Sequence, residues 1–207
     1  MFKSYAHGGS ASGPGSRLWK AGRVALDRDT IVEIAYDALR DRGLGGLTMR
    51  RLAQDLGVQP GALYYHVASK QELLAAVGER ILAGSAGAAP TDDPVGAAQA
   101  IRAALLEVRD SAEIVSFVHA YRPDALPALH GLETIFAARL PSSVARLAAG
   151  TLICFVLGFV AEEQNFAELV RANLAGSARD PETSDAAFTF GVRAILEGLE
   201  HGDLDRG

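Results

Sequence analysis

A glycine between two short helical patterns is the feature that most constrains the fold, and it lies in the stretch LTMRRLAQDLGVQPGALYYHVASKQELL. Thr48 can cap a first helix, and Gly57 readily takes the left-handed conformation that ends one. Pro60 suits the first turn of a second helix, because the N–H that it lacks has no partner there anyway. The spacing therefore predicts two short helices, over residues 48–55 and 59–66, joined by a tight turn.

The rest of the chain repeats apolar residues at three- and four-residue spacing, which is typical of helices with one buried face. Asp27 or Asp29 can cap a helix that ends near Gly43, and Ser69 can cap one that runs to about Ser85. No stretch has a convincing strand pattern, so we predict an all-α fold. The expected elements that follow are a helix from Pro94 with Ile101, Leu105 and Val108 on one face, a connection over Tyr121–Leu129, a helix ending before Pro141, a long helix from a Ser142 or Ser143 cap to about Leu174, and a last helix from Ser184 with a seam of Phe188, Val192, Ile195 and Leu199.

Charge is distributed unevenly along the 207 residues. Through Arg80 the chain has 11 Lys and Arg against 8 Asp and Glu, a net of +3, whereas the remainder has 9 against 17, a net of −8. This asymmetry favours contact between the N-terminal part and a polyanion, although an excess of this size also arises by chance. Residues 1–26 form a Gly/Ser-rich arm that either lies along DNA or is a solvated tail. The basic residues of this arm are Lys3, Arg17, Lys20 and Arg23.

The cysteine content and the first residues favour a cytoplasmic protein. Cys154 is the only cysteine and cannot form an internal disulfide, which fits a reducing compartment. It lies in the longest uncharged run, Leu147–Ala161, so we expect a buried, inert thiol. That run is shorter than the roughly 20 residues that cross a bilayer, so we expect a helix buried inside the protein. The N-terminus has no apolar segment typical of a secretory signal.

Two short helices joined by a glycine-bearing turn form a helix-turn-helix unit. The second helix of such a unit presents residues to base edges in the major groove, while the first braces it. Leu63 and Val67 are expected to face inward, and the outward positions are small or can form hydrogen bonds, although His66 could instead be structural. The candidate DNA-contacting residues are Thr48, Arg50, Gln59, Gly61, Ala62, Tyr64, Tyr65, His66 and Lys70.

The segment from Asp27 to Val77 resembles the DNA-binding domain of the TetR family of bacterial repressors, most clearly in LTMRRLAQDLGV, LYYHV and SKQELL. The resemblance implies a dimer with an N-terminal helix-turn-helix in each subunit and a larger helical domain that binds a small molecule and releases DNA. We therefore expect a flexible basic arm over 1–26, a DNA-binding domain over 27–75, and a ligand-binding and dimerisation domain over 76–207.

The segments LLEVRDSAEIVSFVHAYRP and GFVAEEQNFAEL resemble the ligand domain of the tetracycline repressors. Those repressors hold a magnesium–drug complex with a histidine just before an Arg-Asp pair, and the matching pair in this chain is Arg109–Asp110. Val108 stands there and cannot bind a metal, so we expect a different inducer, with no metal and no cofactor, in a mostly apolar pocket. Each candidate could instead cap or solvate a helix. The candidate ligand-binding residues are Phe117, His119, Arg122, Phe155, Phe159, Glu162, Gln164 and Asn165.

Assembly and mechanism follow from the same resemblance. A single helix-turn-helix holds one half-site and a dimer reads two, so we expect a homodimer built on the helices over 143–173 and 184–200. One domain could also bury both seams itself. Inducer binding would shift the population toward a dimer that no longer fits successive grooves, with the helix over 70–85 as the link. The alternative is a ligand-independent regulator or an activator. An enzyme is not expected, because no nucleophile–base pair, metal cluster or phosphate-binding glycine loop is visible.

Overall fold

The computed structural model describes residues 26–85, 92–177 and 180–201, and within these ranges it contains helices and turns but no strand. The predicted all-α fold is therefore confirmed for this part of the chain. The expected basic arm falls almost wholly on residues outside these ranges.

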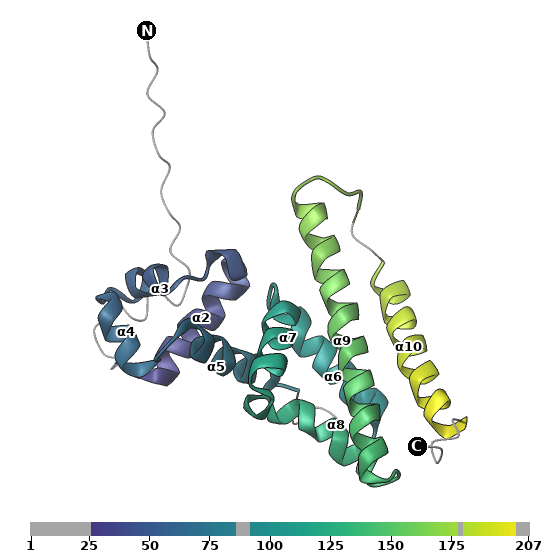
Figure 1. Cartoon of the computed structure of the whole chain (residues 1–207). Coiled ribbons are helices and arrows are strands. Elements are labelled where there is room, and N and C mark those ends of the chain that lie inside the picture. Colours follow the sequence, from purple (N-terminus) through teal and green to yellow (C-terminus); the bar gives the residue numbers. More distant parts are fainter. Residues whose placement is uncertain (1–25, 86–91, 178–179, 202–207) are drawn as a thin grey trace.

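The N-terminal unit is a small group of helices that we call the reading head, residues 27–69. It contains α2 (Arg28–Arg42), α3 (Met49–Leu56) and α4 (Pro60–His66), with the 3-10 turn η1 (Leu44–Gly46) between the first two. The reading head lies at the left of Figure 1, and α5 (Lys70–Leu82) runs from it into a larger helical body. The expected domain boundary after residue 75 falls inside this helix and stays a prediction.

The larger body packs around a long helix, α9. Figure 1 shows α9 and α10 side by side along the edge farthest from the reading head, with the shorter helices between. Its elements are α6 (Pro94–Leu106), α7 (Ser111–Tyr121), the 3-10 turn η2 (Pro123–Ala125), α8 (Pro127–Ala137), α9 (Ser142–Arg171) and α10 (Pro181–His201).

The helices of the reading head begin at the caps that the sequence predicts. The side chain of Asp27 accepts a hydrogen bond from the backbone N–H of Thr30 at 2.8 Å. Thr48 accepts from the N–H of Arg51 at 3.1 Å, and Ser69 caps α5 in the same way. Such caps contribute about 1 kcal/mol each, because they satisfy donors that the first helical turn leaves free.

Two glycines end the first two helices of the reading head. Gly43, after α2, has φ 68°, and Gly57, after α3, has φ 67° and ψ 26°. These angles lie in the left-handed region, where a side chain is strained and glycine is not. The turn that aims α4 is therefore built into the sequence, as predicted.

The body departs from the prediction at Asp110, which divides the run that begins at Pro94. α6 ends at Leu106, and the left-handed φ of 58° at Asp110 interrupts the helical path directly before α7 begins at Ser111. Val108 lies in the corner between them and is fully buried.

The predicted ends of the two longest helices were also wrong in detail. No serine caps α9: Pro141 occupies the N-cap position and Ser142 is the first helical residue. The helix ends at Arg171, short of Leu174, because Asn173 turns left-handed with φ 57°. α10 begins at Pro181 and not at Ser184, since proline is favoured in a first turn and Asp180 accepts a hydrogen bond from the N–H of Thr183 at 3.1 Å.

The prediction that Cys154 is buried was wrong, because this cysteine is exposed. α9 buries the face that carries Leu152 and Val156, and Cys154 lies on another face with Leu147 and Gly158, all three exposed. An uncharged run therefore did not identify which side of the helix is buried.

α9 is long and apolar enough, by length and composition alone, to cross a membrane, with a mean hydropathy of 2.1 over an 18-residue window. A core helix of a folded domain passes the same test. α9 contacts α6, α7, α8 and α10, and 44% of that window is buried inside the protein. The contacts favour a core helix, as the sequence predicts.

The seam of α10 is confirmed, since Phe188 and Val192 are fully buried and the next two seam residues pack partly against the core. Gly191 of α10 faces Phe155 of α9 so closely that a Cβ at this glycine would overlap the phenylalanine ring. The Arg102 guanidinium lies over the Phe188 ring at 4.9 Å and donates to both carboxylate oxygens of Glu163, at 2.9 and 2.6 Å. These contacts hold α6, α9 and α10 together.

Candidate nucleic-acid interface and ligand cleft

α4 presents its aromatic residues outward, as the sequence predicts. Leu63 and Val67 are buried, at 0% and 3% exposure, and fix the inner face of the helix. Tyr65 is 88% exposed and Tyr64 49%, which is unusual for rings of this size. The Tyr65 ring contacts His66 edge-on, with 5.2 Å between the centroids. An outward aromatic pair next to small residues suits contact with a partner surface.

The first turn of α4 is exposed to solvent and carries small side chains. Gln59, Pro60 and Gly61 are exposed, and Ala62 is partly exposed. A Cβ built on Gly61 would meet no atom within 4 Å, so packing inside the protein does not require glycine here. This turn can therefore approach another molecule closely with its backbone.

Basic side chains flank α4. Arg50 of α3 and Lys70 of α5 are exposed, and neither forms an ion pair with any residue in the described ranges. Arg51 differs, because its guanidinium lies 3.9 Å from Asp55. Thr48 is exposed, although its hydroxyl is engaged in capping α3. Arg50 and Lys70 are thus the cations of this surface that remain available for phosphate.

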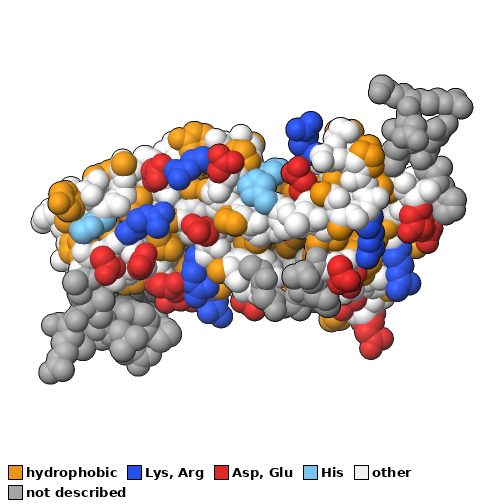
Figure 2. Space-filling model, turned by 90° about the horizontal axis from the view of Figure 1, so that it is seen from below, with side chains coloured by type: hydrophobic (Ala, Val, Ile, Leu, Met, Phe, Trp, Pro, Cys, Tyr) orange, Lys and Arg blue, Asp and Glu red, His pale blue; other side chains and the backbone are white. Residues whose placement is uncertain are grey.

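Charge is mixed on the face that Figure 2 shows. There, Lys and Arg side chains are interspersed with Asp and Glu and do not form one basic field. Charge on this face therefore does not mark a DNA-binding surface, and the features that suit DNA are the exposed groups on α3, α4 and the start of α5.

An open cleft of about 550 Å³ lies between α7 and α9. His119, Gln164 and Asn165, three of the eight predicted ligand-binding residues, line it. Two carboxylates of the lining, Asp110 and Glu113, were not predicted from the sequence, although they have the D-x-x-E spacing typical of a helix start. The remaining lining residues are Ala112, Ser116, Ala120, Cys154, Leu157, Gly158 and Ala161.

The other predicted ligand-binding residues lie elsewhere. The Phe117 ring stacks on Tyr121 with 5.6 Å between centroids. Arg122 forms an ion pair with Glu72 of α5. Phe155 and Phe159 pack with Phe188 between α9 and α10, and Glu162 lies exposed on α9. These five predicted residues therefore do not form one site with the cleft.

His119 is the titratable imidazole of the cleft. Its Nδ1 atom is buried and has no hydrogen-bond partner within the described residues. Burial lowers the pKa of His119 below its usual 6.5, and the charge of His130 lowers it further. His119 is therefore neutral at pH 7.

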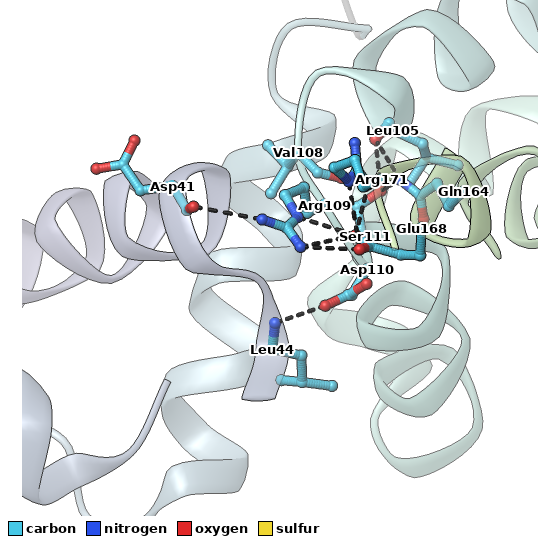
Figure 3. Close-up of polar contacts among 10 residues, drawn as sticks. All are labelled: Asp41, Leu44, Leu105, Val108, Arg109, Asp110, Ser111, Gln164, Glu168 and Arg171. Carbon is cyan, nitrogen blue, oxygen red and sulfur yellow. Dashed lines mark hydrogen bonds and ion pairs between the residues drawn. The ribbon is translucent and has the colours of Figure 1, made fainter. Parts of the chain in front are cut away.

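The corner between α6 and α7 joins the cleft to the reading head (Figure 3). Asp110 Oδ2 accepts a hydrogen bond from the backbone N–H of Leu44, in η1, at 2.6 Å. Arg109 donates to the backbone carbonyl of Asp41, at the end of α2, at 3.4 Å. Two adjacent residues of the body thus hold the turn that leads into α3.

α9 supports this corner from the other side. Arg109 donates to both oxygens of Glu168, each at 3.0 Å, and Arg171 binds the same carboxylate. Hydrogen bonds from Arg171, and then from Arg109, lower the pKa of Glu168. Gln164 donates to the carbonyl oxygens of Leu105 and Val108, at 3.1 and 2.8 Å. The cleft lining and the corner are therefore parts of one hydrogen-bonded network.

No group of three or more His, Cys, Asp or Glu side chains in the described ranges is placed to hold a metal ion. Val108, which occupies the position just before the Arg109–Asp110 pair, is buried away from solvent.

Comparison with known proteins agrees with this geometry. The sequence model of "Bacterial regulatory proteins, tetR family" matches residues 31–77, which include α3 and α4. Over 197 residues the chain is 33% identical to the tetracycline repressor protein class A from transposon 1721 of Escherichia coli, covering 84% of this chain and 90% of that protein. The chain belongs to the TetR family.

Solved structures of the family superpose on this regulator over most of its length. BioQ with its double-stranded DNA operator has a TM-score of 0.68 and 33% identity, over 86% of this chain and 99% of BioQ. A single-residue variant of TetR from Acinetobacter baumannii AYE, in complex with minocycline, has a TM-score of 0.70 and 28% identity, over 85% of this chain and 97% of that one. This TetR-family protein is a DNA-binding transcriptional regulator.

Proposed function

We propose that this regulator is a repressor that binds a near-palindromic operator as a homodimer and is released by a small-molecule inducer. The observation that carries the proposal is the outward display of Tyr64 and Tyr65 on a short helix whose inner face is fixed by Leu63 and Val67. It acts in the cytoplasm, on chromosomal DNA, and has no catalytic role. The two related structures, one with operator DNA and one with minocycline, support both halves of this proposal.

The DNA-contacting residues divide into two groups by position. Gln59, Gly61, Ala62, Tyr64, Tyr65 and His66 of α4 and its N-cap enter the major groove, where small residues and ring edges can contact bases. Thr48, Arg50 and Lys70 flank this helix and bind the phosphate backbone, which positions the protein without reading the sequence. Arg50 is also long enough to reach a base edge.

Dimerisation uses the outer faces of α9 and α10. Leu147 is 70% exposed and Phe190 75%, and a second copy of the chain would cover them. Exposed apolar side chains on two long helices are typical of a self-association surface. A two-fold pair would also place two copies of α4 at the spacing of successive major grooves, about 34–36 Å or a multiple of it.

The inducer binds in the cleft between α7 and α9. Binding in the cleft affects the reading head through three connections, which are the corner at Arg109 and Asp110, the Arg122–Glu72 ion pair, and α5. The ligand shifts the equilibrium only by its difference in affinity for the two states, which is typically about 1–3 kcal/mol. The second candidate is a ligand-independent regulator or an activator. DNA binding that no cleft ligand changes would favour a ligand-independent regulator.

The test is a selection of genomic DNA fragments with the purified full-length chain at about 150 mM salt, where non-specific phosphate binding is weak. We expect a near-palindromic site. Arg50→Ala and Tyr65→Ala should bind it about tenfold more weakly, whereas Arg139→Ala, just past the end of α8, should bind as the wild type does. A reporter driven from the selected site then gives the sign of regulation. Recovery of only salt-sensitive background contradicts the proposal.

A further inference from the structure

Asp110 belongs to two sites at once. Asp110 is among the residues that line the cleft, and its Oδ2 atom accepts the hydrogen bond from the Leu44 N–H that holds η1. Figure 3 shows this carboxylate between the corner and the turn of the reading head. The residue also has a left-handed backbone, with φ 58°, a conformation that few side chains other than Asn and Asp accept. A group that binds Asp110 from the cleft therefore competes directly with the reading head.

The cleft carries negative charge. Asp110 and Glu113 line it one helical turn apart, and no Lys or Arg is among its lining residues in the part of the chain that is described. Arg109 and Arg171 of the network donate their hydrogen bonds to Glu168, and Arg171 interacts with Asp110 only through its charge. Burial, and then the charge of His130, lower the pKa of His119, which favours its neutral form.

Much of the remaining lining is apolar. Leu157, Gly158 and Ala161 come from α9 and Ala112 and Ala120 from α7, while Gln164 and Asn165 add amide groups on the α9 side. The small side chains of glycine and alanine leave room for a flat or compact ligand body. The volume of about 550 Å³ lies in the range of small-molecule sites, roughly 300–1,000 Å³. Carboxylates together with apolar lining residues suit a molecule with one cationic end.

We propose that the cleft binds an apolar molecule that carries an amine, and that its ammonium group, held by Glu113 and Asp110, displaces the Leu44 N–H from the Asp110 carboxylate. Both contacts are charge-assisted hydrogen bonds, but the ammonium brings a full positive charge to the carboxylate whereas the Leu44 amide brings only a partial one, so the ammonium competes with the amide for Asp110. Loss of the Leu44 contact loosens η1 and the start of α3, which braces α4. This inference names the ligand class and the coupling atom of the proposed function and rests on it.

Binding is tested with three probes that share a naphthalene ring, namely the cation 1-naphthylmethylamine, the neutral 1-naphthylmethanol, and the anion of 1-naphthaleneacetic acid. Titration of the full-length protein, followed by naphthalene fluorescence and calorimetry, should show the amine binding about tenfold more tightly than the alcohol, with the acetate weakest. Glu113→Gln should weaken the amine about tenfold and leave the alcohol unchanged. Asp124→Asn, an exposed acid of η2 outside the cleft, is the matched control.

Equal affinity for the amine and the alcohol overturns the proposal, and so does an amine affinity that Glu113→Gln leaves unchanged. Exclusion of all three probes, as when a second copy of the chain covers the cleft, overturns it as well.

Coupling is tested separately, by the affinity for the selected operator with and without saturating 1-naphthylmethylamine. The amine should weaken DNA binding at least fivefold in the wild type. It should have no effect in Asp110→Asn, whose side-chain oxygen still accepts from Leu44 but attracts no cation. Equal weakening in both proteins refutes the role of Asp110. Tight operator binding without discrimination among the probes refutes this inference and leaves the proposed function standing, whereas absence of operator binding refutes the proposed function.

Discussion

The replacement Gly61→Ala should change stability and DNA affinity in opposite directions. Gly61 is the second residue of α4, is exposed, and has open space where a Cβ would stand. Alanine restricts the unfolded chain and favours the helix, which stabilises a helix interior by about 1 kcal/mol and a first turn by less. For a chain of this size, 1 kcal/mol raises the unfolding midpoint by roughly 2–4 °C.

The same methyl group should obstruct the groove. If the first turn of α4 meets base edges through its backbone, an added methyl is a misfit of roughly 1–3 kcal/mol, as in an overpacked core. This corresponds to a loss of about 5- to 150-fold in operator affinity. The assays are thermal unfolding and fluorescence anisotropy with the selected operator at about 150 mM salt.

Gly131→Ala, in α8, is the matched control. Gly131 is also exposed, helical and free of atoms within 4 Å of a built Cβ, so it should stabilise without changing DNA affinity. If Gly61→Ala binds the operator as tightly as the wild type, α4 does not approach DNA through this turn. If it loses stability, the reasoning about open space is wrong.

Three further predictions test other parts of the fold. Replacing Leu147 and Phe190 together by Asp should give a monomer in sedimentation velocity and abolish cooperative operator binding; an unchanged dimer would contradict the proposed interface. Gly43→Ala should lower the free energy of unfolding in urea by about 2 kcal/mol or more, because φ is 68° and the new Cβ would overlap the Asp110 carboxylate; a neutral effect would contradict this geometry. The pKa of His119 is lowered in the folded state, so the unfolded chain binds the proton first, and stability should fall as pH drops below about 6.5; the fall should be smaller in His119→Gln, and equal slopes would contradict the burial of the imidazole.

The reading head could be predicted closely because the residues that begin and end its helices act locally. Thr48, Gly57, Pro60 and Ser69 each act on the backbone within a few residues, and a chain that places them in this order has few alternatives. The two helices that they delimit differ from the prediction by a residue at their ends.

The cleft could not be predicted in the same way, because it depends on which faces of distant helices meet. Periodicity finds an apolar run such as Leu147–Ala161 but not the direction in which Cys154 points. Phe155 and Phe159 were reasonable candidates by composition, yet Phe188 of α10 closes around them. Asp110 was not among the predicted ligand-binding residues, because the neighbouring sequence does not indicate a left-handed conformation there. Its hydrogen-bond partner, Leu44, lies 66 residues away.

The fit between Gly191 and Phe155 has a consequence for how the body can move. A phenylalanine ring packed against a position without a side chain fits only where that glycine lies, so the contact opposes sliding of α10 along α9. We therefore expect the two longest helices to keep their register and to move together. A ligand that displaces the α9 wall of the cleft would then tilt α9 and α10 together, and the angle between the two subunits would change with the occupancy of the cleft.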